Sequence, residues 1–162
     1  MLLGDALLTN LISNKQKHKM KAEDLRIGNC VTIENAKSWL DLKGIPMVVI
    51  GIDKILQPLK MVAFPLSKYS IRLEGIERTE YNQFEEFIQP IEVNEEWLIK
   101  LGFIKDVDTN YRWFLLDESL TYDLDDYCIR ISDSWEFGKR KYVHELQNLI
   151  YALTLSDIGV LS

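Results

Sequence analysis

Residues 141–153 read KYVHELQNLIYAL and carry the clearest structural pattern in the chain. The apolar side chains recur with the spacing of one helical face, as Tyr142 or Val143, then Leu146, Leu149 or Ile150, and Leu153. The opposite face gathers side chains that form hydrogen bonds without a full charge, namely His144, Gln147, Asn148 and Tyr151. We therefore predict an amphipathic helix with one face in a core.

The polar face of this predicted helix allows two interpretations. It could be a contact surface, which docks a partner protein or holds the N-terminal half of the chain through hydrogen bonds. It could also be the solvated side that every surface helix presents. We favour a contact surface formed by His144, Gln147, Asn148 and Tyr151 and turned toward the N-terminal half.

A second helix and three strands are predicted before this segment. Asn94 is a suitable N-cap, Glu95 and Glu96 suit the positive end of a helix, and Gly102 is placed for a C-terminal cap. Strands are expected at residues 111–116, 127–131 and 134–137, with an acidic loop at 117–126 between the first two. The second half therefore predicts an α-β-β-β-α layer.

The first half is rich in β signals. Short apolar runs recur about every ten residues between glycines and prolines, at residues 30–33, 47–52, 60–64 and 70–73. Arg26, Gly28 and Asn29 form the expected turn before the first strand. Residues 35–40 could add one helical turn, and residues 74–86 are expected to be an exposed connection or a sheet edge. This spacing favours a small antiparallel barrel of the SH3-like kind.

The predicted fold class is therefore α+β, with three segments. Residues 20–90 form a β-rich, barrel-like module and residues 91–162 an α+β module that ends in the amphipathic helix. Residues 1–19 are interpreted as an N-terminal extension, because MKAEDLRIGN from Met20 reads like a natural start. Translation from Met1 or from Met20 remains open.

Charge and composition narrow the functional classes. The formal net charge is −6, and a negative field repels phosphate backbones, which disfavours nucleic acid as a partner. The basic residues 15–21 and 139–141 are interpreted as solvated. The sequence contains no apolar run near the roughly 20 residues that span a bilayer, so we expect a cytoplasmic protein without a membrane partner.

No metal, cofactor or catalytic residue is assigned from the sequence. Cys30 and Cys128 lack the spacing of metal ligands, and they could be paired or, as we favour, reduced. The acidic loop lacks the glycine of a calcium-binding EF-hand. His18 and His144 are the two histidines, and neither has a glycine-flanked serine or a reactive cysteine nearby in sequence.

Several blocks of the sequence resemble a known family. These are MKAEDLRIGN at 20–29, FIQPI at 87–91, EEWLIKLGF at 95–103, KYVHELQNL at 141–149 and ALT at 152–154. In this order they are similar to a set of short uncharacterised proteins from Bacteroidetes-type bacteria, their phages and integrated elements. The resemblance implies origin and architecture, and it supports Met20 as the ancestral start. Residues 35–80 match no pattern of the family, and LSDI at 155–158 departs from its usual Gly-Glu-Glu.

From these observations we expect an accessory protein of a phage or mobile element that acts through protein–protein contacts, with itself or with a host protein. A nucleic-acid-associated regulator with an SH3-like barrel is the alternative. An enzyme centred on His144 is the weaker alternative.

Overall fold

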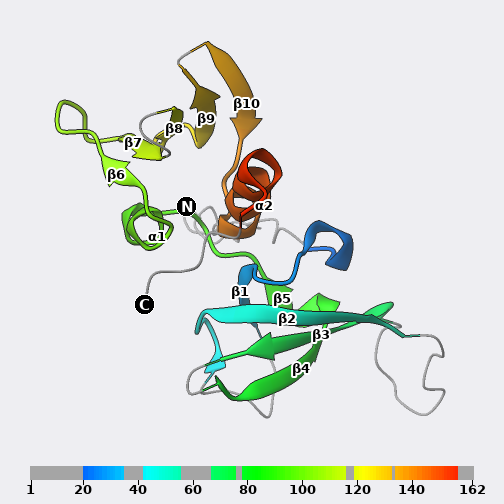
Figure 1. Cartoon of the computed structure of the whole chain (residues 1–162). Helices are drawn as coiled ribbons and strands as arrows, with labels where there is room; N and C mark the ends of the chain where they lie inside the picture. The colour runs from blue at the N-terminus through cyan, green and yellow to red at the C-terminus, as the bar shows by residue number, and fades with distance from the viewer. Residues whose placement is uncertain are drawn as a thin grey trace, which may run out of the picture.

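The computed structural model describes residues 20–34, 42–55, 67–75, 78–115, 119–132 and 134–156. These residues form two five-stranded antiparallel sheets and two α-helices. In Figure 1 one sheet lies below, the other lies above, and both helices lie between them. The predicted α+β class is confirmed.

The first sheet has the strand order β4-β3-β2-β1-β5. Its elements are β1 (Cys30–Ile33), β2 (Met47–Lys54), β3 (Tyr69–Glu74), β4 (Glu80–Phe84) and β5 (Ile88–Gln89), with the 3-10 turns η1 (Ala22–Asp24) before β1 and η4 (Glu85–Phe87) before β5. Strands β1 to β4 form a meander, and β5 returns to pair with β1. Within the described residues β4 and β5 do not pair with each other, so no closed barrel is found.

Alternation along β1 divides its side chains between two cores. Val31 and Ile33 are buried in the core of the first sheet, where the largest buried neighbours are Met20, Met47, Ile71, Leu73 and Ile88. Cys30 points to the other face, because successive side chains of a strand alternate, and it packs in the core of the second half. Strand β1 therefore contributes to both cores.

The second sheet has the strand order β10-β9-β8-β7-β6. The elements of this half are α1 (Glu95–Lys100), β6 (Ile104–Lys105), β7 (Arg112–Leu115), β8 (Leu120–Asp123), β9 (Cys128–Ile131), β10 (Trp135–Lys139) and α2 (Val143–Thr154). Helix α1 is capped as predicted, because the Asn94 Oδ1 atom accepts a hydrogen bond of 2.9 Å from the Trp97 N–H. Gly102 follows the helix at a φ of +84°.

The predicted acidic loop at 117–126 is wrong in part. Strand β8 lies inside it, and β6 adds a further strand, so the sheet has five strands instead of three. Tertiary packing explains β8: Tyr122 is fully buried, its ring packs against that of Phe103 in a T-shaped arrangement, and its hydroxyl donates to the Arg140 carbonyl at 2.8 Å. The acidic residues that follow, Asp125 and Asp126, form the turn to β9.

Three expectations for the first half fall partly or wholly on residues outside the described ranges. These are the extension at 1–19, the helical turn at 35–40 and the strand at 60–64. Residues 74–86 contain β4, which forms an edge of the first sheet. In the described part of the chain, no helix combines the length and the apolar character needed to cross a membrane.

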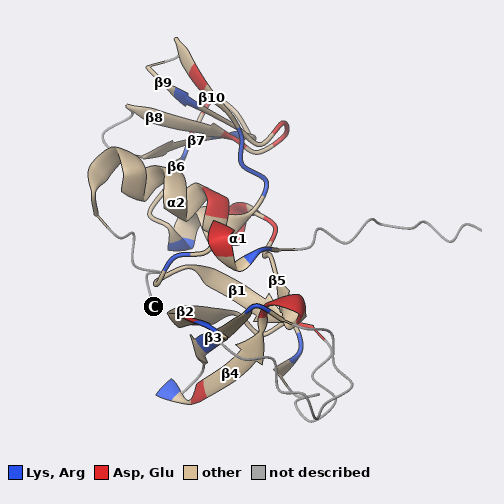
Figure 2. Ribbon diagram, turned by 90° about the vertical axis from the view of Figure 1, so that its right-hand side faces the viewer, with Lys and Arg blue, Asp and Glu red and all other residues tan. Residues whose placement is uncertain are grey.

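Helix α2 lies at the centre of the molecule. Val143, Leu146 and Ile150 are buried in one cluster with residues of α1 and the second sheet. The Tyr142 N–H donates to the Glu145 carboxylate at 3.2 Å, which satisfies a donor at the start of the helix. Figure 2 shows α2 between β7–β8 and β1, so the face opposite its apolar residues is turned toward the first half of the chain.

Candidate functional site

The polar face of α2 lies against residues 24–30. Gln147 is buried, and its side chain amide binds the backbone on both sides of Asn29: the Cys30 N–H donates to Gln147 Oε1 at 2.9 Å, and Gln147 Nε2 donates to the Gly28 carbonyl at 3.2 Å. Because β5 pairs with β1 only at Thr32 and Ile33, the Gln147 amide replaces a strand partner at the start of β1.

Asn148 extends this contact to the turn before β1. Its Oδ1 atom accepts a bond of 2.9 Å from the Asn29 side chain, and its Nδ2 atom donates to the Asp24 carbonyl at 2.9 Å. Asn29 is completely buried, and its Oδ1 atom accepts the Arg26 N–H at 2.7 Å. All four polar groups of Asn29 are satisfied, since its N–H donates to Arg26 and its carbonyl accepts from Val49.

Glycine at position 28 suits this turn. Gly28 has a φ of +92°, a region that L side chains adopt rarely, and its N–H donates to the Val49 carbonyl at 2.7 Å. The turn residues Arg26, Gly28 and Asn29 therefore present their polar groups to α2 on one side and to β2 on the other.

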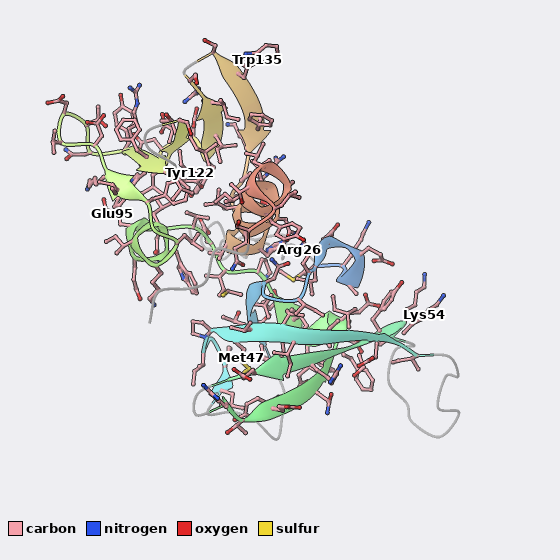
Figure 3. The ribbon with its side chains drawn as sticks, in the orientation of Figure 1. Arg26, Met47, Lys54, Glu95, Tyr122 and Trp135 are labelled. Carbon is pink, nitrogen blue, oxygen red and sulfur yellow. The ribbon has the colours of Figure 1, made fainter. Side chains whose placement is uncertain are left out.

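Tyr151 contacts this turn through its ring. The guanidinium carbon of Arg26 lies 3.5 Å from the centroid of the Tyr151 ring, which is a cation–π geometry. Figure 3 shows Arg26 beside α2, between that helix and η1. The structure thus brings Gln147, Asn148 and Tyr151 together with residues 24–30.

His144 lies one turn before Gln147 and Asn148 and is 2% exposed. Its ring is stacked with that of Tyr142, with centroids 6.1 Å apart. It also lines an open pocket of about 510 Å³ between η1 and α2, together with Glu23, Asp24, Arg140, Glu145, Asn148 and Leu149. Among these described lining residues there is no serine, threonine or cysteine, so the pocket provides His144 with no hydroxyl or thiol nucleophile.

The two cysteines are buried free thiols. Burial raises the pKa of the Cys30 thiol to about 11, while a hydrogen bond from Gln147 acts in the opposite direction. A thiol with such a pKa is protonated at neutral pH and is a poor nucleophile. Cys30 is therefore part of the packing between α2 and β1.

The basic residues 139–141 are partly neutralised by the chain itself. Lys141 Nζ lies 3.4 Å from the Glu92 carboxylate, and this carboxylate also accepts the Tyr127 hydroxyl at 2.7 Å. The interaction with Glu92 raises the pKa of both Lys141 and Tyr127. In Figure 2 the described Lys and Arg positions lie in both halves of the molecule.

The acidic residues around β8 and β9 surround an arginine. The Arg130 guanidinium lies within 3.5–4.0 Å of carboxylate oxygens of Asp123, Asp126 and Glu136. Asp117 and Glu118 lie outside the described residues. Within the ranges that the structure describes, no three His, Cys, Asp or Glu side chains gather closely enough to hold a metal ion.

The sequence did not predict that Asn29 and Gly28 form hydrogen bonds with α2. Asn29 and Asn148 are 119 residues apart, and no local pattern connects them. The one available signal was that an asparagine next to a glycine preceded a buried strand, which indicated a turn and nothing about its partner.

Comparisons with protein-family models, with curated proteins and with solved structures found no match for this chain.

Proposed function

We propose that this protein is an accessory protein of a phage or mobile element that acts through contacts with a host protein. The observation that carries the proposal is a set of exposed apolar side chains on the β6–β7 hairpin. Ile104, Val107 and Tyr111 are 72%, 97% and 37% exposed, and Phe114 pairs directly with Ile104. Phe114 is half-buried, and Tyr111, two residues before the buried Trp113, projects to the opposite face of the strand. We name Ile104, Val107 and Phe114 the hairpin surface.

The strand register places Ile104 and Phe114 on one face of the hairpin. Residues that pair across two antiparallel strands project to the same face of the sheet, so Ile104 and Phe114 are neighbours. Val107 lies in the connection between the two strands, which extends from the body of the molecule in Figure 1. Exposed apolar groups that cluster in this way are typical of protein–protein contacts.

The charges beside the hairpin surface indicate the kind of partner. Asp106 and Asp108 flank Val107, and the chain carries a net charge of −6. A partner with an apolar patch and a basic rim would match both features. The hydrogen bonds of α2 to residues 24–30 engage Gln147 and Asn148 within the chain. The partner contact is therefore proposed on the hairpin surface and not on the polar face of α2.

The experiment is co-purification from host cells with two matched charge insertions. Val107→Glu places a carboxylate on the hairpin surface, whereas Ile27→Glu places one at a position of the first half that is 63% exposed. We expect Val107→Glu to lose a partner that the wild type and Ile27→Glu retain, with all three proteins unfolding at similar temperatures. Equal partner profiles for the three proteins would contradict the proposal.

The cytoplasmic location and the SH3-like layout belong to the same proposal. The return of β5 to β1 after η4 supports the layout, and the register shift between Val49 and Gly51 bends β2. An experimental structure in which the two ends of this sheet curl around the buried core would support an SH3-like module, and a flat sheet would contradict it. Fractionation of host cells tests the location.

A further inference from the structure

Strand β10 forms an edge of the second sheet. In the part of the chain that the structure describes, it pairs with β9 alone. Its first residue, Trp135, is 73% exposed and lies at the far end of the strand in Figure 3. An edge strand presents unpaired backbone groups, which can pair with another chain.

A bulge in β10 places two opposite charges on one face. Glu136 pairs with Arg130 and Lys139 pairs with Cys128, so a step of three residues along β10 matches a step of two residues along β9. Arg130 and Cys128 are two residues apart and project to the same face. Glu136 and Lys139 therefore share that face, although residues three apart in a regular strand would face opposite ways.

The backbone of this edge is turned outward at Lys139. The Arg140 N–H donates to the Tyr127 carbonyl at 2.8 Å. Because the two groups of one trans peptide point in opposite directions, the Lys139 carbonyl faces the free edge. It accepts a bond of 2.8 Å from the Arg140 side chain, and its second lone pair can accept a bond from another strand.

We propose that β10 pairs antiparallel with β10 of a second copy of this chain, about a two-fold axis, with Glu136 of each copy opposite Lys139 of the other. A two-fold axis makes every contact occur twice, so this register forms two oppositely charged pairs. The same register sets Trp135 opposite Arg140 of the second copy, where a guanidinium can lie on the indole ring.

The charge pattern indicates a second copy as the occupant of this edge. An arbitrary extended peptide would gain only the backbone hydrogen bonds, whereas a second β10 also matches a negative and a positive side chain at the right positions. The contact involves five residues from each chain, so it is small, and we expect a weak dimer whose population rises with concentration.

Sedimentation equilibrium of the full chain tests the register through charge reversal. Glu136→Lys or Lys139→Glu alone turns both charged pairs into like-charge contacts, and we expect the dimer to weaken about tenfold or more. An equimolar mixture of these two variants restores opposite charges in the heterodimer. We therefore expect the mixture to associate about as tightly as the wild type.

Two controls keep this test independent of folding. Lys139→Glu is the primary variant, because Glu136→Lys would also remove the contact of 4.0 Å between Glu136 and Arg130 within the chain. The unfolding temperature of Lys139→Glu is measured alongside. Lys54→Glu makes the same charge change at an exposed lysine at the end of β2 and should leave association unchanged. A wild type that is monomeric at every concentration, or a mixture that associates no better than its components, overturns the proposal.

Discussion

On the face of α2 that is turned to the second sheet, Val143, Leu146 and Ile150 are at most 1% exposed and make apolar contacts. On the face turned to residues 24–30, Gln147 and Asn148 make directional hydrogen bonds. Burial of apolar side chains is the main favourable contribution to folding, and it tolerates the exchange of one apolar side chain for another of similar volume. Hydrogen bonds contribute less, but a wrong partner leaves a buried group unsatisfied. The helix is therefore held strongly on one face and specifically on the other.

The largest effect is expected on the apolar face. Leu146→Ala removes a fully buried side chain, and we expect the free energy of unfolding to fall by about 2–5 kcal/mol. Leu153→Ala is the matched control on the same helix, because Leu153 is 38% exposed, and it should cost less than about 1 kcal/mol. Denaturant unfolding measures both. Equal losses would show that the two leucines do not differ in burial.

A smaller effect is expected on the polar face. Gln147→Met keeps an unbranched side chain of similar length but leaves the Cys30 N–H and the Gly28 carbonyl without their partner. We expect a loss of about 1–3 kcal/mol, together with faster hydrogen exchange at the Cys30 amide. If Gln147→Met unfolds at the same denaturant concentration as the wild type, the amide does not hold β1.

The buried thiol of Cys30 predicts that the free energy of unfolding depends on pH. The pKa of Cys30 is raised from an ordinary 9.0 to about 11, chiefly by burial. The unfolded chain loses this proton first, so the stability that is fully present below pH 9 is lost as the pH rises toward about 11. The slope is about 1.4 kcal/mol per pH unit for one group. Subtracting the unfolding free energies of Cys30→Ala from those of the wild type across this range isolates the contribution.

The smallest effect is expected where the polar face reaches solvent. Arg26 lies 3.5 Å from the centroid of the Tyr151 ring, and a partly exposed cation–π pair contributes about 0.5–1 kcal/mol. A double-mutant cycle with Arg26→Gln and Tyr151→Leu should return a coupling of this size. A coupling of zero would mean that the stacked arrangement adds nothing beyond its separate contacts.

The amphipathic pattern of α2 was readable from sequence because the period of a helix is local. The cap at Asn94 and the strand at 30–33 were readable for the same reason. Strand β8 could not be predicted from the sequence in this way. Its residues Leu120–Asp123 are flanked in sequence by acidic residues, and their conformation depends on pairing with β7 and β9 on both sides in the sheet. Propensity within a short window does not contain that information.

Only the helical part of the candidate site could be predicted from the sequence. The sequence identified His144, Gln147, Asn148 and Tyr151 as a group, because they share a helical face. The sequence could not show that Asn148 and Gln147 bind Asn29 and Gly28, because each of these pairs is separated by more than 100 residues. The sequence also could not distinguish the environments of His144 and Tyr151. His144 is buried beside Tyr142, whereas the ring of Tyr151 is covered by the Arg26 guanidinium.

The position of Cys30 has a consequence for cutting the chain. Cys30 belongs to the segment before residue 90 but packs in a cluster with Leu146 and Ile150. A protease that cleaves once in the connection at residues 90–94 would therefore yield two fragments that we expect to remain associated. Expressed as separate polypeptides, the two pieces should recombine on mixing, which would make this chain a natural candidate for fragment complementation.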